Sequence, residues 1–370
     1  MARLSGEELS TLQDAFTRLL ADKCTEEQVR SWMEDRKGYD PTLWKAMSEM
    51  GLTSLLVEER HGGAGAGIIA VERVMEQAGS ALLGAPLLAS AVMSVAALQA
   101  SGDEDAQSRL LPQLASGSLV ATLLITSPEG DWTGKTLGIS AERRGDDWVL
   151  SGASGFVLHG RGADCWIAVA NTDSGPALFE IEPSSHGATC LALPSFDHTL
   201  VLDKITLTDT PARQIGDVGS GWQSIQHALD LGLVALAGEQ AGGAQRILDI
   251  TVDYANIRHQ FGRPIGSFQA VKHMAADLIV EVESAISAAR QAAEKTDDGA
   301  DDAPAWRYLA GFSCADAFVR SAADAVQMHG GIAFTWEHVA HLYLRRSRAD
   351  QQLLGSSNYF REQYLCALGG

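Results

Sequence analysis

The sequence is short of cations and has few cysteines. It contains 28 Lys and Arg residues against 47 Asp and Glu residues, which leaves a formal net charge of -19 over 370 residues. Nucleic-acid binding needs clustered cations that neutralise phosphates, so a chain this acidic is a poor candidate for that function. The five cysteines are odd in number and widely separated, and they form neither a C-x-x-C zinc pattern nor the framework of a secreted disulfide-rich protein.

Long apolar runs are also missing. No run reaches the ~18 residues that a membrane span would need. The opening segment MARLSGEELSTLQDAF predicts a polar, amphipathic helix without the apolar stretch of a signal peptide. We therefore expect a cytoplasmic protein without a membrane span. Apolar residues still make up 46% of the chain, which is enough to bury a large core in two or three domains.

Hydrophobic periodicity divides the chain into three parts. Apolar residues recur at helical spacing up to about residue 115. From about Leu119, five short runs rich in Val, Ile, Leu and aromatic residues alternate with turn-formers, which predicts an antiparallel β region. After Trp222 the helical spacing returns, and an apolar face predicts packing in a bundle. The predicted fold class is α+β, with an N-terminal helical domain at 1–117, a middle antiparallel β domain at 118–212 and a C-terminal four-helix bundle at 213–370.

Two motifs in the last part resemble a known family. YANIRHQFGRPIGSFQ (254–269) contains the order Arg-X-Gln-Phe-Gly-X-Pro-Ile, and AVQMHGGIAF (325–334) contains Gln-X-X-Gly-Gly. Together with the three-part order and LWKAMSEMGLTSLLVEERHGG (43–63), they resemble the acyl-CoA dehydrogenase family over nearly the whole chain. The resemblance implies an enzyme that binds FAD between subunits and forms a Cα–Cβ double bond in an acyl-CoA thioester. In that reaction a carboxylate removes the α proton while a hydride passes to the flavin.

The resemblance also implies which residues hold the ADP half of an FAD whose flavin ring lies mainly on the neighbouring subunit. These residues are Arg258, Gln260 and Phe261 in the first motif and Gln327, Gly330 and Gly331 in the second. A guanidinium is a permanently charged fork suited to a pyrophosphate, and glycine lets a backbone approach a cofactor closely. The alternative is that Arg258 pairs with an acid such as Asp253 and that the two glycines merely end a helix.

The catalytic base of the family is missing from its usual places. Many members carry a glutamate before a glycine some two dozen residues after the Gly-Gly pair, and here that position is Leu354. Other relatives carry it on the helix that leads into the first motif, where this chain has Gly232. Neither residue can accept a proton. Glu239, about two helical turns beyond Gly232, is a weak candidate for the base, and the alternative is a salt bridge or a local network.

The flavin seat departs from the family as well. The loop of the type Thr-Glu-Pro-Gly-Ala-Gly-Ser-Asp corresponds to ITSPEGDWTG (125–134), which is shorter and lacks the Gly-X-Gly-Ser run. Phe156 retains an aromatic residue near the expected ring, but Leu158 stands where a hydroxyl would bond it. These departures and the missing base imply that this subunit does not seat a flavin ring itself.

Two other groups of polar residues have ordinary explanations. His338 and His341 are three residues apart on a predicted helix, but no third ligand is apparent, so we predict no metal site. Arg345, Arg346 and Arg348 form a basic cluster that could meet a nucleotide phosphate or could equally be a solvated helix face.

The first hypothesis is a chain that resembles the smaller, base-less subunit of bacterial α2β2 acyl-CoA dehydrogenases of steroid side-chain degradation. A related partner subunit would then supply the glutamate and the flavin seat, and this chain would supply the clamp for FAD. An acyl-CoA substrate and an electron acceptor would be the further partners. A self-sufficient homotetramer that uses Glu239, and an assembly partner without cofactor, remain as alternatives.

Overall fold

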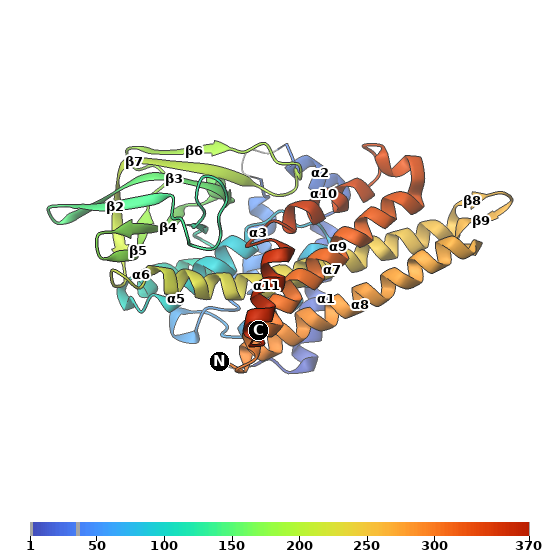
Figure 1. The fold of residues 1–370 in the computed structure, drawn as a ribbon, viewed down its shortest axis with the longest axis horizontal. Coiled ribbons are helices and arrows are strands. Elements are labelled where there is room, and N and C mark those ends of the chain that lie inside the picture. Colours follow the sequence, from blue (N-terminus) through green and yellow to red (C-terminus); the bar gives the residue numbers. More distant parts are fainter. Residues whose placement is uncertain (1–2, 35–37, 370) are drawn as a thin grey trace.

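The computed structural model describes residues 3–34 and 38–369, and it arranges them in three parts (Figure 1). Helices form the first part, and several begin at strong capping residues. Ser5 and Glu8 form a reciprocal capping box at the start of the first helix. At the start of the last helix of this part, the Asp103 carboxylate accepts a hydrogen bond from the Ala106 N–H. The helices are α1 (Gly6–Lys23), α2 (Glu26–Trp32), α3 (Pro41–Glu49), η1 (Glu59–His61), α4 (Gly67–Ser80), η2 (Leu87–Ser94), α5 (Val95–Ala100) and α6 (Glu104–Ala115).

A seven-stranded sheet forms the middle part, with the order β1-β4-β2-β3-β7-β5, an additional β4–β5 pairing that closes it on itself, and β6 paired to β7. Most pairs are antiparallel, as predicted, but β1 runs parallel to β4. The strands are β1 (Ala121–Leu124), β2 (Ile139–Arg144), β3 (Asp147–Leu158), β4 (Cys165–Thr172), β5 (Gly175–Ile181), β6 (Ala188–Ala192) and β7 (Leu202–Ile215). β2 and β6 lie outside the five predicted runs because most of their side chains are exposed and give no apolar signal.

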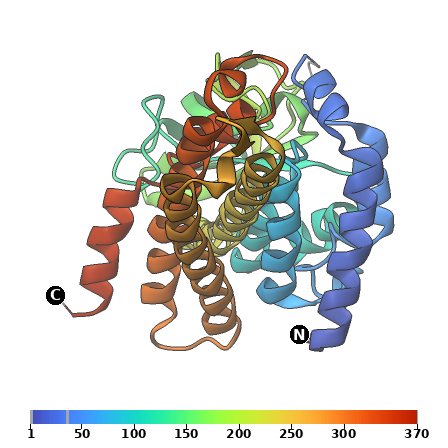
Figure 2. The same cartoon turned by 90° about the vertical axis from the view of Figure 1, so that its right-hand side faces the viewer.

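Long helices form the last part and lie side by side (Figures 1 and 2). Figure 2 shows α1 and α11 on opposite sides of these helices. The elements are α7 (Gly221–Ile257), β8 (His259–Gln260), β9 (Arg263–Pro264), η4 (Ile265–Ser267), α8 (Gln269–Asp297), α9 (Ala303–His329), η5 (Gly330–Phe334), α10 (Ala340–Asp350) and α11 (Ser357–Ala367). The predicted class, with a helical domain on each side of a β domain, is confirmed. β7 extends beyond residue 212, and we retain the boundaries at 117/118 and 212/213 as a proposal.

Helices α4 and α7 cross with almost no side chain between them. A Cβ atom on Gly79 would lie 1.8 Å from the carbonyl oxygen of Glu239, and one on Gly242 would lie 1.8 Å from that of Glu76. Only glycine permits this backbone approach. The crossing fixes the middle of α7 and the side chains that it carries into the core.

None of the helices in the described ranges is both long enough and apolar enough to cross a bilayer.

Candidate cofactor clamp and the filled base position

The first motif forms a hairpin between α7 and α8, at the end of the long helices farthest from the β domain (Figure 1). His259 pairs with Pro264 and Gln260 pairs with Arg263. Phe261 sits at the tip with a positive φ of 53° and is 92% exposed. A left-handed backbone conformation is unfavourable for an aromatic residue, and an exposed side chain adds little stability from burial. This residue therefore does not stabilise the isolated chain. The hairpin therefore presents its polar and aromatic groups outward.

The second motif ends α9. Gly330 is the C-cap, with φ 66° and ψ -143°, a conformation that strongly favours glycine. A Cβ atom on Gly330 or Gly331 would meet no atom within 4 Å. Helix termination accounts for Gly330, but packing within this chain does not require glycine at Gly331. The backbone at this point is open to another molecule.

Aromatic stacking brings the two motifs together. The ring of Tyr254, four residues before Arg258, stacks on His329, with centroids 4.4 Å apart and planes 24° apart. The Arg258 N–H donates to the Tyr254 carbonyl at 2.9 Å, which continues α7 up to the motif. His329 directly precedes Gly330, and its Nδ1–H donates to the Ala325 carbonyl at 2.8 Å. The predicted contact residues thus come from neighbouring helix ends.

Arg258 is exposed, and no carboxylate of the described residues lies within salt-bridge distance of it, Asp253 included. The alternative pairing with Asp253 is therefore absent. A free guanidinium, an exposed aromatic ring and an open glycine backbone fit the needs of the ADP half of an FAD: a permanent cation, a stacking surface and close main-chain approach. When bound, FAD supplies hydride acceptance, and these residues could only hold and orient its nucleotide end.

The two usual positions of the base lie next to each other in space. A Cβ atom on Gly232 would lie 3.3 Å from Cδ1 of Leu354 and 3.0 Å from Cγ of Met93. Leu354 is buried and has a positive φ of 61°, which is unusual for a leucine. Sequence analysis did not single out Met93, because nothing in its local pattern relates it to a residue so distant in sequence. Apolar side chains therefore fill the space beside Gly232.

Little free volume remains around this position. The cavity lined by Leu354, Leu233, Trp132 and Tyr359 has a volume of about 20 Å³. Such a space holds about one water molecule. An acyl chain would have to displace these side chains to enter.

The shortened loop, residues 125–134, packs onto the start of α7. A Cβ atom on Gly134 would lie 2.2 Å from the ring of Trp222, so the loop and the helix are in direct contact. The Thr126 hydroxyl donates to the Gly155 carbonyl, which ties the loop to β3. Phe156 remains 40% exposed, whereas Leu158 is buried. The loop closes on its own chain and carries no Gly-X-Gly-Ser segment that could cradle a ring.

Glu239 is buried and bound to Arg346, with 2.5 Å between Oε1 and Nη1. Arg346 also binds Asp197 at 2.9 Å and donates to the hydroxyl and carbonyl oxygens of Thr199. The network joins α7, α10 and the loop between β6 and β7. The expectation that Arg346 belongs to a solvated or phosphate-binding cluster is therefore wrong for this residue, which is 1% exposed because its charge is neutralised inside the protein. Arg345 instead lies over the rings of Phe196 and Trp336.

The network contains more acids than bases. Burial raises the pKa of Glu239, and Arg346 offsets part of that effect. Burial raises the pKa of Asp350 well above its usual range, and neither of its carboxylate oxygens has a hydrogen-bond partner. Burial next to two arginines lowers the pKa of His159 to about 3, so this residue is neutral. The cavity between Glu239 and His159 has a volume of about 20 Å³, which leaves no room for a thioester beside Glu239.

The two candidate metal ligands belong to an aromatic cluster. His338 lies 4.5 Å from His329 between ring centroids, and His341 stacks on Trp336 at 4.8 Å. In the described ranges no group of three or more His, Cys, Asp or Glu side chains is arranged to hold a metal ion.

Fold and sequence together define the class of protein. Residues 6–118 match the acyl-CoA dehydrogenase N-terminal domain, and residues 219–368 match the acyl-CoA dehydrogenase C-terminal domain. The chain is 33% identical over 351 residues to the acyl-CoA dehydrogenase IpdE2 of Mycolicibacterium smegmatis, covering 95% of both chains. The chain belongs to the acyl-CoA dehydrogenase family, a family of flavoproteins that oxidise CH–CH bonds.

A second relative and two solved structures are also similar to this chain. IpdE2 of Mycobacterium tuberculosis is 31% identical and covers 95% of this chain and 94% of its own. Among solved structures, a variant of the Tcur3481–Tcur3483 steroid acyl-CoA dehydrogenase superposes with a TM-score of 0.88 at 28% identity, covering 98% of both chains. The ChsE4–ChsE5 complex of Mycobacterium tuberculosis superposes with a TM-score of 0.90 at 27% identity, covering 100% of this chain and 99% of the other.

Proposed function

We propose that this chain is the non-catalytic subunit of a heteromeric, FAD-dependent acyl-CoA dehydrogenase. It holds the ADP half of an FAD through Arg258, Gln260, Phe261, Gln327, Gly330 and Gly331. A related partner subunit provides the base and the seat of the flavin ring, so that α,β-dehydrogenation of the acyl-CoA thioester takes place in the partner.

The observation that carries the proposal is the contrast between the two ends of α7. At one end, the adjacent positions Gly232 and Leu354 are closed by apolar packing, with Met93 and Leu354 both against Gly232. At the other end, Arg258 is exposed beside open glycines, and no carboxylate in the described part of the chain pairs with it. A chain that used its own active site would need the first region open and polar.

Glu239 is a structural residue in this proposal. A general base must lie within hydrogen-bond reach of the proton that it removes. Glu239 already bonds to Arg346 and faces a cavity of about 20 Å³, which argues against the self-sufficient homotetramer. The exposed clamp argues against an assembly partner without cofactor, because Arg258 pairs with no carboxylate of the described residues and the Phe261 ring, 92% exposed, adds little to the core.

The substrate that we propose is a bulky acyl-CoA, such as a steroid side-chain CoA ester. The similar Tcur3481–Tcur3483 structure is a steroid acyl-CoA dehydrogenase, which supports this choice, and the similar ChsE4–ChsE5 structure is a complex, which supports a heteromer. Losing half of the active sites leaves more room for a large acyl group at the remaining ones.

Co-expression tests the proposal. The chain is purified alone and together with a sister subunit of the same family, and flavin absorbance and acyl-CoA-dependent ferrocenium reduction are measured. We expect little flavin in the lone chain and about half an FAD per chain, with turnover, in the complex. One FAD per chain with turnover in the lone protein contradicts the proposal. Activity that survives Glu239→Gln in the complex removes Glu239 as a base.

A further inference from the structure

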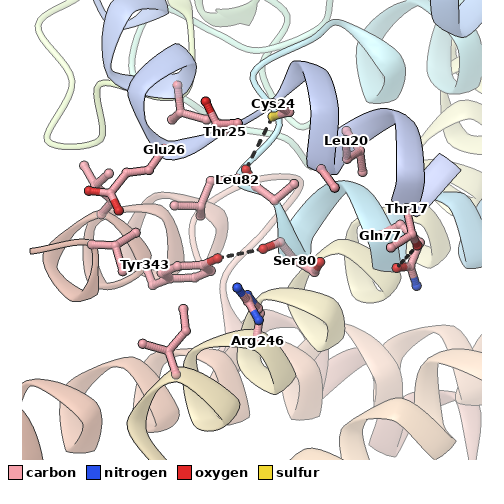
Figure 3. A pocket seen from close by; sticks show the side chains of 16 residues that line it. Thr17, Leu20, Cys24, Thr25, Glu26, Gln77, Ser80, Leu82, Arg246 and Tyr343 are labelled. Atoms are coloured by element: carbon pink, nitrogen blue, oxygen red, sulfur yellow. Dashed lines mark hydrogen bonds between the residues drawn. The ribbon is translucent and has the colours of Figure 1, made fainter. Parts of the chain in front are cut away.

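A larger cavity, of about 550 Å³, lies where α1, α2, α4, α7 and α10 meet (Figure 3). We call it the α1–α10 cavity. Small-molecule sites have volumes of roughly 300–1,000 Å³, so its size suits an organic ligand rather than a lone ion. None of the clamp residues and neither base position lines it. Arg246, on its α7 wall, is 14 residues from Gly232, or about 21 Å along the helix at ~1.5 Å per residue. The cavity is therefore separate from the site described above.

Much of the wall is apolar. Leu20 and Val29 line it from the N-terminal helices, Leu82 from the end of α4, and Leu342 from α10, and all four are buried. Side chains of this kind favour contact with the hydrocarbon body of a ligand.

Most polar groups in the wall already have partners. The Tyr343 hydroxyl donates to the Ser80 carbonyl at 2.6 Å, and the Thr17 hydroxyl donates to Oε1 of Gln77 at 2.9 Å (Figure 3). Glu26, the acid that lines the cavity, accepts from Arg30 at 2.6 Å. These groups do not require a ligand.

Arg246 is the cation of the wall, and its side chain hydrogen-bonds the Tyr343 hydroxyl. It is solvent-exposed, and no carboxylate of the described ranges lies within 4.0 Å of its guanidinium. Figure 3 shows its side chain directed from α7 toward the hydrogen bond between Tyr343 and Ser80. In a chain with a net charge of -19, a cation left without an acid beside an apolar cavity is available to an anion.

We propose that the α1–α10 cavity binds an amphipathic carboxylate. The guanidinium of Arg246 receives the carboxylate through two parallel hydrogen bonds, and the hydrocarbon body lies against Leu20, Leu82 and Leu342. A single lining cation suits a monoanion. A CoA thioester, with several phosphate charges, would need further cations that the cavity does not have.

Calorimetric titration of the full chain with decanoate tests this proposal, and 1-decanol and decyl phosphate serve as comparison ligands. We expect saturable binding of decanoate at one site. Arg246→Gln is expected to weaken decanoate binding at least tenfold and to leave 1-decanol unchanged, while the matched control Arg348→Gln, on the exposed part of α10, changes neither.

A second variant separates binding from folding. Ala21→Trp, at an exposed position of α1 that lines the cavity, is expected to abolish binding of decanoate and of 1-decanol without lowering the melting temperature. The proposal is overturned if decanoate does not saturate, if Arg246→Gln binds it as wild type does, or if decyl phosphate binds more tightly through Arg246. No flavin or partner enters this measurement, so its outcome is independent of the proposed function.

Discussion

Gly232 and Leu354 face each other across the core, so that a Cβ atom on the glycine would lie 3.3 Å from Cδ1 of the leucine. They are 122 positions apart in the sequence, and each is a place where the family resemblance predicts a catalytic glutamate. Their proximity fits that expectation, because both positions reach the same point between α7 and the segment after α10. In this chain the point is occupied by hydrocarbon.

Packing at this point can be measured with a double-mutant cycle. Alanine is favoured over glycine within a helix by about 1 kcal/mol, but a new Cβ atom on Gly232 meets Cγ of Met93 at 3.0 Å. In wild type the new methyl group overpacks against Met93, and in a Met93→Ala background this overpacking is relieved. We therefore expect Gly232→Ala to change the free energy of unfolding more favourably in the Met93→Ala background, by about 1–3 kcal/mol. Denaturant unfolding of the four variants gives this coupling energy. Additive effects would mean that the two side chains do not compete for space.

Flavin retention should depend on Arg258 in the assembled enzyme. A lost hydrogen bond to a charged group costs about 1.5–3 kcal/mol, so Arg258→Ala is expected to raise the dissociation constant for FAD about 10- to 150-fold. Arg258→Lys retains the charge without the planar fork, so its dissociation constant for FAD should lie between those of wild type and Arg258→Ala. Arg143→Ala, on the exposed strand β2, is the matched control. Unchanged FAD content in Arg258→Ala contradicts the assignment of this residue to the clamp.

Arg346 should be important for stability. Arg346→Met leaves Asp197 and Glu239 buried without their cation, and removing one partner of a buried ion pair costs about 3–5 kcal/mol. The neighbouring Arg345→Met removes a cation that lies over exposed Phe196 and Trp336, and its cost should stay near 1 kcal/mol. Urea unfolding of both variants tests the difference. Equal effects would show that the buried network contributes no more than the surface contact.

Glu72 should make the protein less stable as the pH rises. Its carboxylate oxygens have no hydrogen-bond partner, the nearest cation is Arg73 at 3.6 Å, and burial raises its pKa to about 8. In the folded state the group keeps its proton up to that pH, whereas in the unfolded state it loses the proton near its ordinary pKa of 4.5. Its contribution to stability is therefore complete below the unfolded pKa and declines as the pH rises toward 8, by up to about 1.4 kcal/mol per pH unit.

Glu72→Gln tests this dependence, because the amide cannot ionise. The variant should resemble wild type at pH 5 and melt at a higher temperature than wild type at pH 8. Glu59→Gln, at an exposed position, serves as the control and should leave the pH profile unchanged. A Glu72→Gln profile parallel to that of wild type would mean that Glu72 is ionised in the folded protein.

Periodicity was sufficient to predict where helices give way to strands, because burying one face of a helix or a sheet imposes a regular spacing of apolar residues. It was insufficient for β2 and β6, whose exposed side chains leave no such spacing. It also gave no indication that β1 runs parallel to β4, since strand direction depends on how the chain returns to the sheet.

By itself, the sequence was enough to predict the family and to propose the clamp residues, because contiguous motifs such as RHQFGRPIG keep their chemistry in a short segment. Tertiary structure alone decided which groups are free and which are neutralised. Arg258 and Arg346 are both arginines on or beside long helices, yet the first is open to a ligand and the second is buried among acids from distant segments. Burial and charge pairing arise from residues far apart in the chain, and the local sequence around either arginine does not contain them.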